Sequence, residues 1–150
     1  MKQKVHNLWI AFLGAILSML GISSCSWFHR VEYGCPHADY KFVGEVTDGE
    51  KPIAGIRAVV FNGPMDQKYN AVDTSYTDAA GKTERELPIS MLSSDMVIKF
   101  EDVDGEENGS WQTETVPRES LELVQTADKD GKWYEGAYTI KAKATLKKAE

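Results

Sequence analysis

The clearest hydrophobic pattern lies near the C-terminus, where apolar and polar side chains alternate over residues 138–147. The apolar positions are Tyr138, Ile140, Ala142, Ala144 and Leu146, and every position between them is Thr or Lys. Successive side chains of a strand point to opposite faces, so this period predicts a strand with one face on a core. The lysines on the other face would also discourage pairing with another sheet edge.

Shorter alternations of the same kind recur between turn signals. They predict strands over residues 40–47, 56–61, 72–77, 96–101 and 111–116, with a further one around Leu121 and Leu123. Residues 88–94 leave two alternatives open, because Met91 and Leu92 fit either a helical turn or a cap on the core. No convincing helix follows residue 25, so we expect a single antiparallel β-sandwich of seven or eight strands.

The first residues follow a different pattern. Lys2 and Lys4 precede an uncharged apolar run over residues 8–22, which is shorter than the roughly 20 residues of a spanning helix. This arrangement is typical of a secretory signal peptide.

The segment after the apolar run is Ile22-Ser23-Ser24-Cys25, which resembles the lipobox of bacterial lipoproteins. The resemblance implies that a signal peptidase recognises Ile22, Ser23 and Ser24, cuts before Cys25, and leaves a diacylglycerol on the Cys25 thiol. The alternative is a free cysteine that happens to follow an N-terminal helix. Two or three acyl chains on one cysteine make a stable membrane anchor.

These boundaries divide the chain into a lipoprotein signal peptide over 1–24, a lipidated N-terminus and tether over 25–38, and a sandwich domain over 39–150. We expect a membrane-anchored lipoprotein of the cell envelope. Ser26 follows the lipidated cysteine, and a residue other than Asp there resembles an outer-membrane sorting signal.

Charge excludes one class of function. The 150-residue chain has 17 Lys+Arg and 23 Asp+Glu, a net charge of −6, and loss of Lys2 and Lys4 with the signal peptide makes it −8. Nucleic-acid binding depends on neutralising phosphates, so we do not expect a nucleic-acid partner.

The positions of Cys and His exclude most catalytic chemistry. Residues 38–150 contain neither residue type, which leaves no Ser-His-Asp triad, Cys-His dyad or Cys/His zinc site in the body of the domain. A carboxylate pair or Ser-Lys chemistry is not excluded in this way. We nevertheless expect no enzyme and no cofactor.

Three features have both a functional and a structural interpretation. Asp102, Asp104 and Glu106 form a dense acidic loop that could bind Ca²⁺, although Thr113 stands where an EF-hand loop needs Glu. The structural alternative is a solvated hairpin loop. Cys35, beside Gly34 and Pro36, is either an accessible modification site or a small buried residue.

The third feature is a set of aromatic residues, Trp111, Trp133, Tyr134 and Tyr138. Their rings could stack on a sugar or a peptide, whereas in small sandwiches aromatic residues are more often part of the core.

Several segments resemble known families. Gly44-x-Val46-x-Asp48, Pro52-Ile53-x-Gly55 and Thr77-Asp78-x-x-Gly81-Lys82 are similar to the carboxypeptidase regulatory-like, or transthyretin-like, β-sandwich. That resemblance covers residues 40–87 and implies that the Thr-Asp-x-x-Gly segment closes a hairpin. Thr83 departs from the family pattern, which usually has an aromatic or aliphatic residue there.

A second resemblance covers essentially the whole chain. Glu32-Tyr33-Gly34-Cys35-Pro36, the loop over 104–109 and Gly131-Lys132-Trp133-Tyr134 are similar to the radical SAM-associated lipoproteins of Bacteroidota-type bacteria. The resemblance implies a radical SAM enzyme in the gene neighbourhood. The chain has no three-Cys cluster motif of its own.

The sequence therefore favours a non-enzymatic binding or assembly module with an envelope protein or peptide as its partner. The alternative is a maturation substrate or accessory of a radical SAM enzyme, modified in the segment around Cys35. That chemistry is cytoplasmic, so such a modification must precede export.

Overall fold

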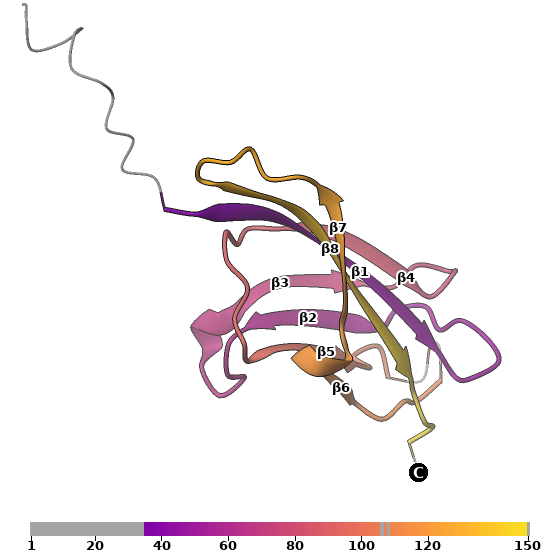
Figure 1. The fold of residues 1–150 in the computed structure, drawn as a ribbon. Coiled ribbons are helices and arrows are strands. Elements are labelled where there is room, and N and C mark those ends of the chain that lie inside the picture. Colours follow the sequence, from indigo (N-terminus) through magenta and orange to yellow (C-terminus); the bar gives the residue numbers. More distant parts are fainter. Residues whose placement is uncertain (1–34, 106, 108, 150) are drawn as a thin grey trace, which may run out of the picture. The chain divides into compact units, whose positions relative to one another are not determined.

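Eight strands form two four-stranded sheets in the computed structural model, which describes residues 35–105, 107 and 109–149 (Figure 1). The strands are β1 (His37–Thr47), β2 (Arg57–Asn62), β3 (Ala71–Tyr76), β4 (Lys82–Leu87), β5 (Met96–Glu101), β6 (Glu114–Pro117), β7 (Glu122–Ala127) and β8 (Tyr134–Thr145). Two single-turn 3-10 helices, η1 (Lys68–Asn70) and η2 (Arg118–Ser120), lie between strands. The expected all-β sandwich is confirmed, and of the seven or eight strands expected the structure has eight.

The first sheet has the order β4-β1-β8-β7 and the second has the order β3-β2-β5-β6. Neighbouring strands are antiparallel with one exception, since β1 and β8 are parallel from Tyr40 opposite Tyr138 to Thr47 opposite Thr145. The expectation of a wholly antiparallel sandwich is wrong at this pair. Parallel strands need a long connection, and here the rest of the sandwich supplies it.

The lysines of β8 lie in the middle of the first sheet, so the expectation that they protect an edge is wrong. Lys143 Nζ lies 3.5 Å from Glu45 Oε2 on β1, and Lys141 Nζ lies 3.0 Å from Glu122 Oε1 on β7. Glu45 Oε1 is also 3.3 Å from Lys82 Nζ on β4. The lysines therefore belong to cross-strand ion pairs that run over the outer face of the sheet.

The core lies between the sheets and is made by the predicted apolar faces. Its fully buried members include Phe42, Val46, Met96, Ile98, Phe100 and Ile140. β4 contributes Leu87 and the smaller Thr83 to the interior. Thr83 lies opposite Gly44, and its methyl group occupies the space that a side chain on Gly44 would need. A small β-branched residue therefore suits this strand.

The connections between strands differ from expectation at two places. The turn over residues 77–82 joins β3 of one sheet to β4 of the other, so it is a corner between sheets and not a hairpin. Residues 88–94 form no helical turn, and Ile89 and Leu92 pack against the core as a cap. The predicted strand over 111–116 begins later, at Glu114, and Trp111 forms an isolated bridge with Lys148.

Candidate functional site

One end of the sandwich gathers most of the features that the sequence singled out. We call it the N-terminal end, and it comprises the start of β1 with the connections over residues 62–70, 88–95 and 128–133. In Figure 1 these segments lie together on the left, on the side from which β1 enters the fold. The C-terminus lies on the opposite side of the domain.

Backbone hydrogen bonds join the parts of this end. The His37 amide donates to the Trp133 carbonyl at 2.9 Å, and the Ala38 amide donates to the Ser90 carbonyl at 3.0 Å. The side chain of Asn62 then holds the next connection, because its amide donates to the Met91 carbonyl at 3.0 Å and its oxygen accepts from the backbone amide of Ser93 at 2.8 Å. The three connections are thus fixed to β1 and to each other.

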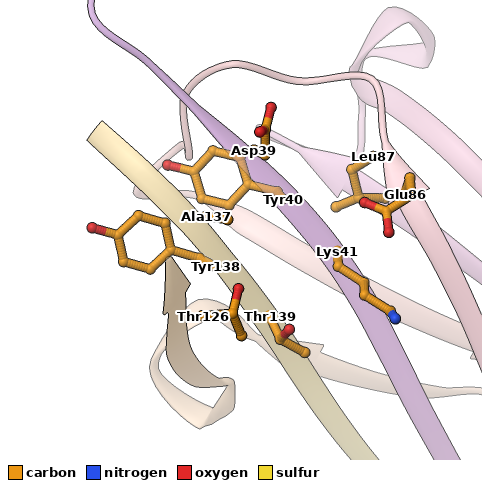
Figure 2. Close-up of a pocket in the computed structure, with 9 residues that line it drawn as sticks. All are labelled: Asp39, Tyr40, Lys41, Glu86, Leu87, Thr126, Ala137, Tyr138 and Thr139. Atoms are coloured by element: carbon orange, nitrogen blue, oxygen red, sulfur yellow. The ribbon is translucent and has the colours of Figure 1, made fainter. Parts of the chain in front are cut away.

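Two tyrosines lie side by side on the parallel strands at this end. The rings of Tyr40 and Tyr138 are stacked, with centroids 5.8 Å apart and planes 22° from parallel. Figure 2 shows their hydroxyl ends pointing the same way, away from Lys41. Burial raises the pKa of Tyr40, and the neighbouring Tyr138 adds to the rise. Both rings are half-buried, and Tyr40 packs against the hydrophobic core.

A third tyrosine ties the beginnings of the same two strands together. The Tyr134 hydroxyl donates to Asp39 Oδ2 at 3.0 Å, and this hydrogen bond raises the pKa of Tyr134. The Tyr134 ring lies 5.6 Å from the His37 ring, between centroids. Both contacts connect side chains of β1 and β8 where the strands enter the sheet.

A cavity of about 370 Å³ crosses all four strands of the first sheet (Figure 2). Its lining consists of Asp39, Tyr40, Lys41, Glu86, Leu87, Thr126, Ala137, Tyr138 and Thr139. We call it the sheet cavity. Its polar groups include side chains of both positive and negative charge and two threonine hydroxyls. This arrangement suits hydrogen bonds to a polar ligand or to a peptide backbone. Lys41 also pairs with Glu84 of β4 at 2.5 Å, which raises the pKa of Lys41.

A second cavity, of about 310 Å³, opens at the N-terminal end itself. It is lined by Pro36, His37, Ala38, Tyr40, Ser90, Met91, Leu92 and Glu135. Most of these side chains are apolar, and Met91 is 66% exposed. The two cavities share only Tyr40, which separates a polar surface from a largely apolar one.

Cys35 is the first residue that the structure describes, and its thiol is free and exposed. Its carbonyl oxygen lies 3.3 Å from His37 Nδ1, just before β1 begins. Of the two interpretations that the sequence allowed, the small buried residue is therefore wrong. The accessible thiol remains a candidate for modification.

Asp102 has a structural role in the acidic loop. One of its carboxylate oxygens accepts from the Trp111 amide at 2.9 Å, and the other accepts from the Asp104 amide at 3.2 Å. These bonds close the base of the loop between β5 and β6. Glu106, which the calcium hypothesis also needs, lies outside the described residues. Within those residues no three His, Cys, Asp or Glu side chains gather to hold a metal ion.

The four expected aromatic residues do not form one set. Tyr134 and Tyr138 lie at the N-terminal end with Trp133, which is 42% exposed, whereas Trp111 packs on the core near the end of β8. Sequence reasoning placed Tyr40 only on a core face and missed its stacking on Tyr138. The sequence does place each tyrosine at the start of an apolar strand face. Predicting that the two rings stack also requires knowing that β1 and β8 pair in parallel with Tyr40 opposite Tyr138.

The lipidation residue and its recognition segment, Ile22, Ser23, Ser24 and Cys25, also lie outside the described residues. In the part that is described, no helix has the length and hydropathy of a membrane span.

The sequence matches no protein-family model and no curated protein. Among solved structures, the chain is similar to catechol 1,2-dioxygenase from Pseudomonas arvilla C-1, with 14% identity and a TM-score of 0.48. The match covers 79% of this chain but only 55% of that one. The strand order of the two sheets, independently of this match, defines the class of the fold as an eight-stranded, two-sheet β-sandwich.

Proposed function

We propose that the chain is an exported, lipid-anchored binding module of the cell envelope and that it has no catalytic activity. The observation that carries the proposal is the spacing between Cys25 and the fold. The lipobox-like segment ends only ten residues before Cys35, where the compact sandwich begins. A lipid on Cys25 would hold a self-contained domain close to a membrane without any spanning helix.

The sheet cavity is the binding surface of this proposal. Asp39, Lys41 and Thr139 project from β1 and β8, two central strands whose register is fixed on both sides. Sites on strands hold their groups more rigidly than sites on loops. The mixture of charge and hydroxyl groups favours a polar segment of an envelope protein or peptide as the partner.

Mass spectrometry of the protein from its own membranes tests the anchor. We expect residues 25–150 with a diacylglycerol on Cys25, and we expect Cys25→Ser to abolish both lipidation and cleavage. An uncleaved N-terminus with a free Cys25 thiol would refute the anchor.

A photo-crosslinking residue at Thr139 tests the binding surface in the same cells. We expect a specific adduct that is lost when Lys41→Glu reverses the charge beside it. The matched control carries the photo-crosslinker at Thr74 of β3 in the second sheet and should give no such adduct. Equal labelling from both positions would contradict the proposed surface.

One observation favours a second candidate function. The exposed Cys35 thiol is accessible to an enzyme, as a maturation substrate of a neighbouring radical SAM enzyme requires. The same mass spectrum discriminates the two functions, since a substrate carries additional mass on the peptide that contains Cys35. A binding module carries the lipid alone.

A further inference from the structure

Large apolar side chains are exposed to solvent at the N-terminal end. Seven large hydrophobic residues are exposed in the described part of the chain. Four of them lie on the connections of the N-terminal end: Met65 at 43%, Tyr69 at 79%, Met91 at 66% and Trp133 at 42% exposed. They come from three separate connections, which the hydrogen bonds of His37, Ala38 and Asn62 hold together.

We propose that this end of the domain rests on the lipid surface in which Cys25 is anchored, with Met91 and Trp133 in contact with the headgroup region. The inference depends on the proposed lipid anchor and adds an orientation to it. A cluster of exposed apolar residues generally marks an interaction surface. Trp and Tyr have an apolar ring and a polar tip, which suits them to the membrane interface.

The length of the tether identifies the lipid surface as the occupant. Cys35 lies ten positions after Cys25, so even a fully extended tether reaches only about 35 Å, and a flexible one averages about 20 Å. β1 has 11 residues and is therefore about 35 Å long. The tether joins the domain at its N-terminal end, so its limited reach favours contact between that end, with its exposed side chains, and the lipid surface.

Charge determines which lipid suits the contact. The mature chain has a net charge of −8, so anionic headgroups would repel it. The contact relies on apolar side chains, and vesicles of phosphatidylcholine, a zwitterionic lipid, therefore make the appropriate probe. High salt should leave the contact unchanged, because it does not depend on long-range attraction.

Two tryptophans at opposite ends of the sandwich make the orientation measurable. Trp133 lies at the N-terminal end, whereas Trp111 bridges to Lys148 beyond the end of β8. One reporter retains Trp133 through W27F and W111F, and the matched reporter retains Trp111 through W27F and W133F. Both are full-length mature proteins, lipidated and reconstituted into phosphatidylcholine vesicles with either ordinary or brominated acyl chains, because bromine quenches tryptophan only within the bilayer region.

We expect brominated lipid to remove most of the Trp133 emission and to leave the Trp111 emission unchanged. Met91→Ser should restore part of the Trp133 emission, whereas Val103→Ser, which changes an exposed apolar residue at the opposite end, should not. Equal quenching of both reporters, or quenching of neither, would overturn the orientation. The mass of the reconstituted protein is measured first, so an unlipidated Cys25 would refute the anchor separately.

Discussion

At the scale of single residues, Thr77 is the least exposed of the buried polar residues in the described part of the chain. It is 5% exposed, and its hydroxyl accepts from the Ile56 amide at 3.0 Å while it donates to the Ile53 carbonyl at 2.8 Å. One hydroxyl thus satisfies two buried backbone groups on the segment that leads into β2. Satisfying buried polar groups matters more than forming additional hydrogen bonds on the surface.

Two substitutions at Thr77 therefore distinguish the contribution of its hydroxyl group to stability from that of its methyl group. Thr77→Val keeps the shape but leaves both backbone groups unsatisfied, so we expect a loss of about 1–3 kcal/mol in the free energy of unfolding. Thr77→Ser keeps the hydroxyl and should lose clearly less. Urea denaturation measures both variants, and an equal loss would mean that the packing of the methyl group, and not the hydroxyl, dominates.

Gly81 illustrates the other kind of residue constraint. Its backbone has φ = +68°, and a Cβ atom there would lie 2.4 Å from the carbonyl oxygen of Val46. Gly131 has a similar φ of +77° but nothing within 4 Å of the same position. The two glycines share the left-handed backbone and differ only in their surroundings.

We expect Gly131→Ala to lower the free energy of unfolding by about 1–2 kcal/mol, the cost of a left-handed alanine. Gly81→Ala adds a clash with backbone and should lose more than about 3 kcal/mol. Thermal unfolding measures both variants, and the difference between their losses in the free energy of unfolding gives the steric contribution at Gly81. Similar losses would show that the corner between β3 and β4 can move.

At the scale of elements, a group of ion pairs centred on the half-buried Glu101 lies where β2 pairs with β5. Glu101 is 15% exposed and lies 2.7 Å from both Arg57 Nη2 and Lys99 Nζ. Burial alone would raise the pKa of Glu101, but hydrogen bonds from Lys99 and Arg57 outweigh it and hold the pKa below its usual value. A lowered pKa in the folded state means that the unfolded chain binds the proton more readily at low pH.

The contribution of Glu101 to stability is therefore present above the unfolded pKa of about 4.5 and is lost as the pH falls through the lower folded pKa. We expect Glu101→Gln to cost about 1–3 kcal/mol at pH 7 and to converge with the unchanged protein in acid. Glu84→Gln is the matched control, because its pair with Lys41 is exposed and should contribute less than about 1 kcal/mol. Denaturation midpoints between pH 3 and pH 7 test both variants.

The sequence predicted those elements whose faces alternate cleanly. Met96, Ile98 and Phe100 mark β5, and Ile140, Ala142 and Ala144 mark β8, because each strand puts consecutive apolar positions on the core. In β4 only Thr83 and Leu87 are buried, so its alternation of apolar and polar residues is too weak to predict a strand. Which strands pair is a long-range property, and for this reason neither the parallel register of β1 with β8 nor the sheet cavity that it creates was predicted.

At the scale of the whole molecule, the buried hydrophobic core of the described part lies between Ala38 and Leu146. We expect a protein of residues 35–150 to fold alone and to unfold in one cooperative transition, with the same midpoint by circular dichroism and by fluorescence. Residues 35–137 provide the control. They lack most of β8, which lies between β1 and β7, and should not fold. Loss of the transition in residues 35–150 would show that the preceding segment contributes to the fold.

The parallel pairing of β1 with β8 also determines how the domain resists force. A pull between the tether before β1 and the chain after β8 draws two adjacent strands in opposite directions along their length. The hydrogen bonds from Tyr40 opposite Tyr138 to Thr47 opposite Thr145 then bear the load together in shear, and none can break far ahead of the rest. In an antiparallel pair pulled in the same way, the hydrogen bonds would break one after another from one end. The parallel register therefore gives the domain a mechanically strong connection between its two ends.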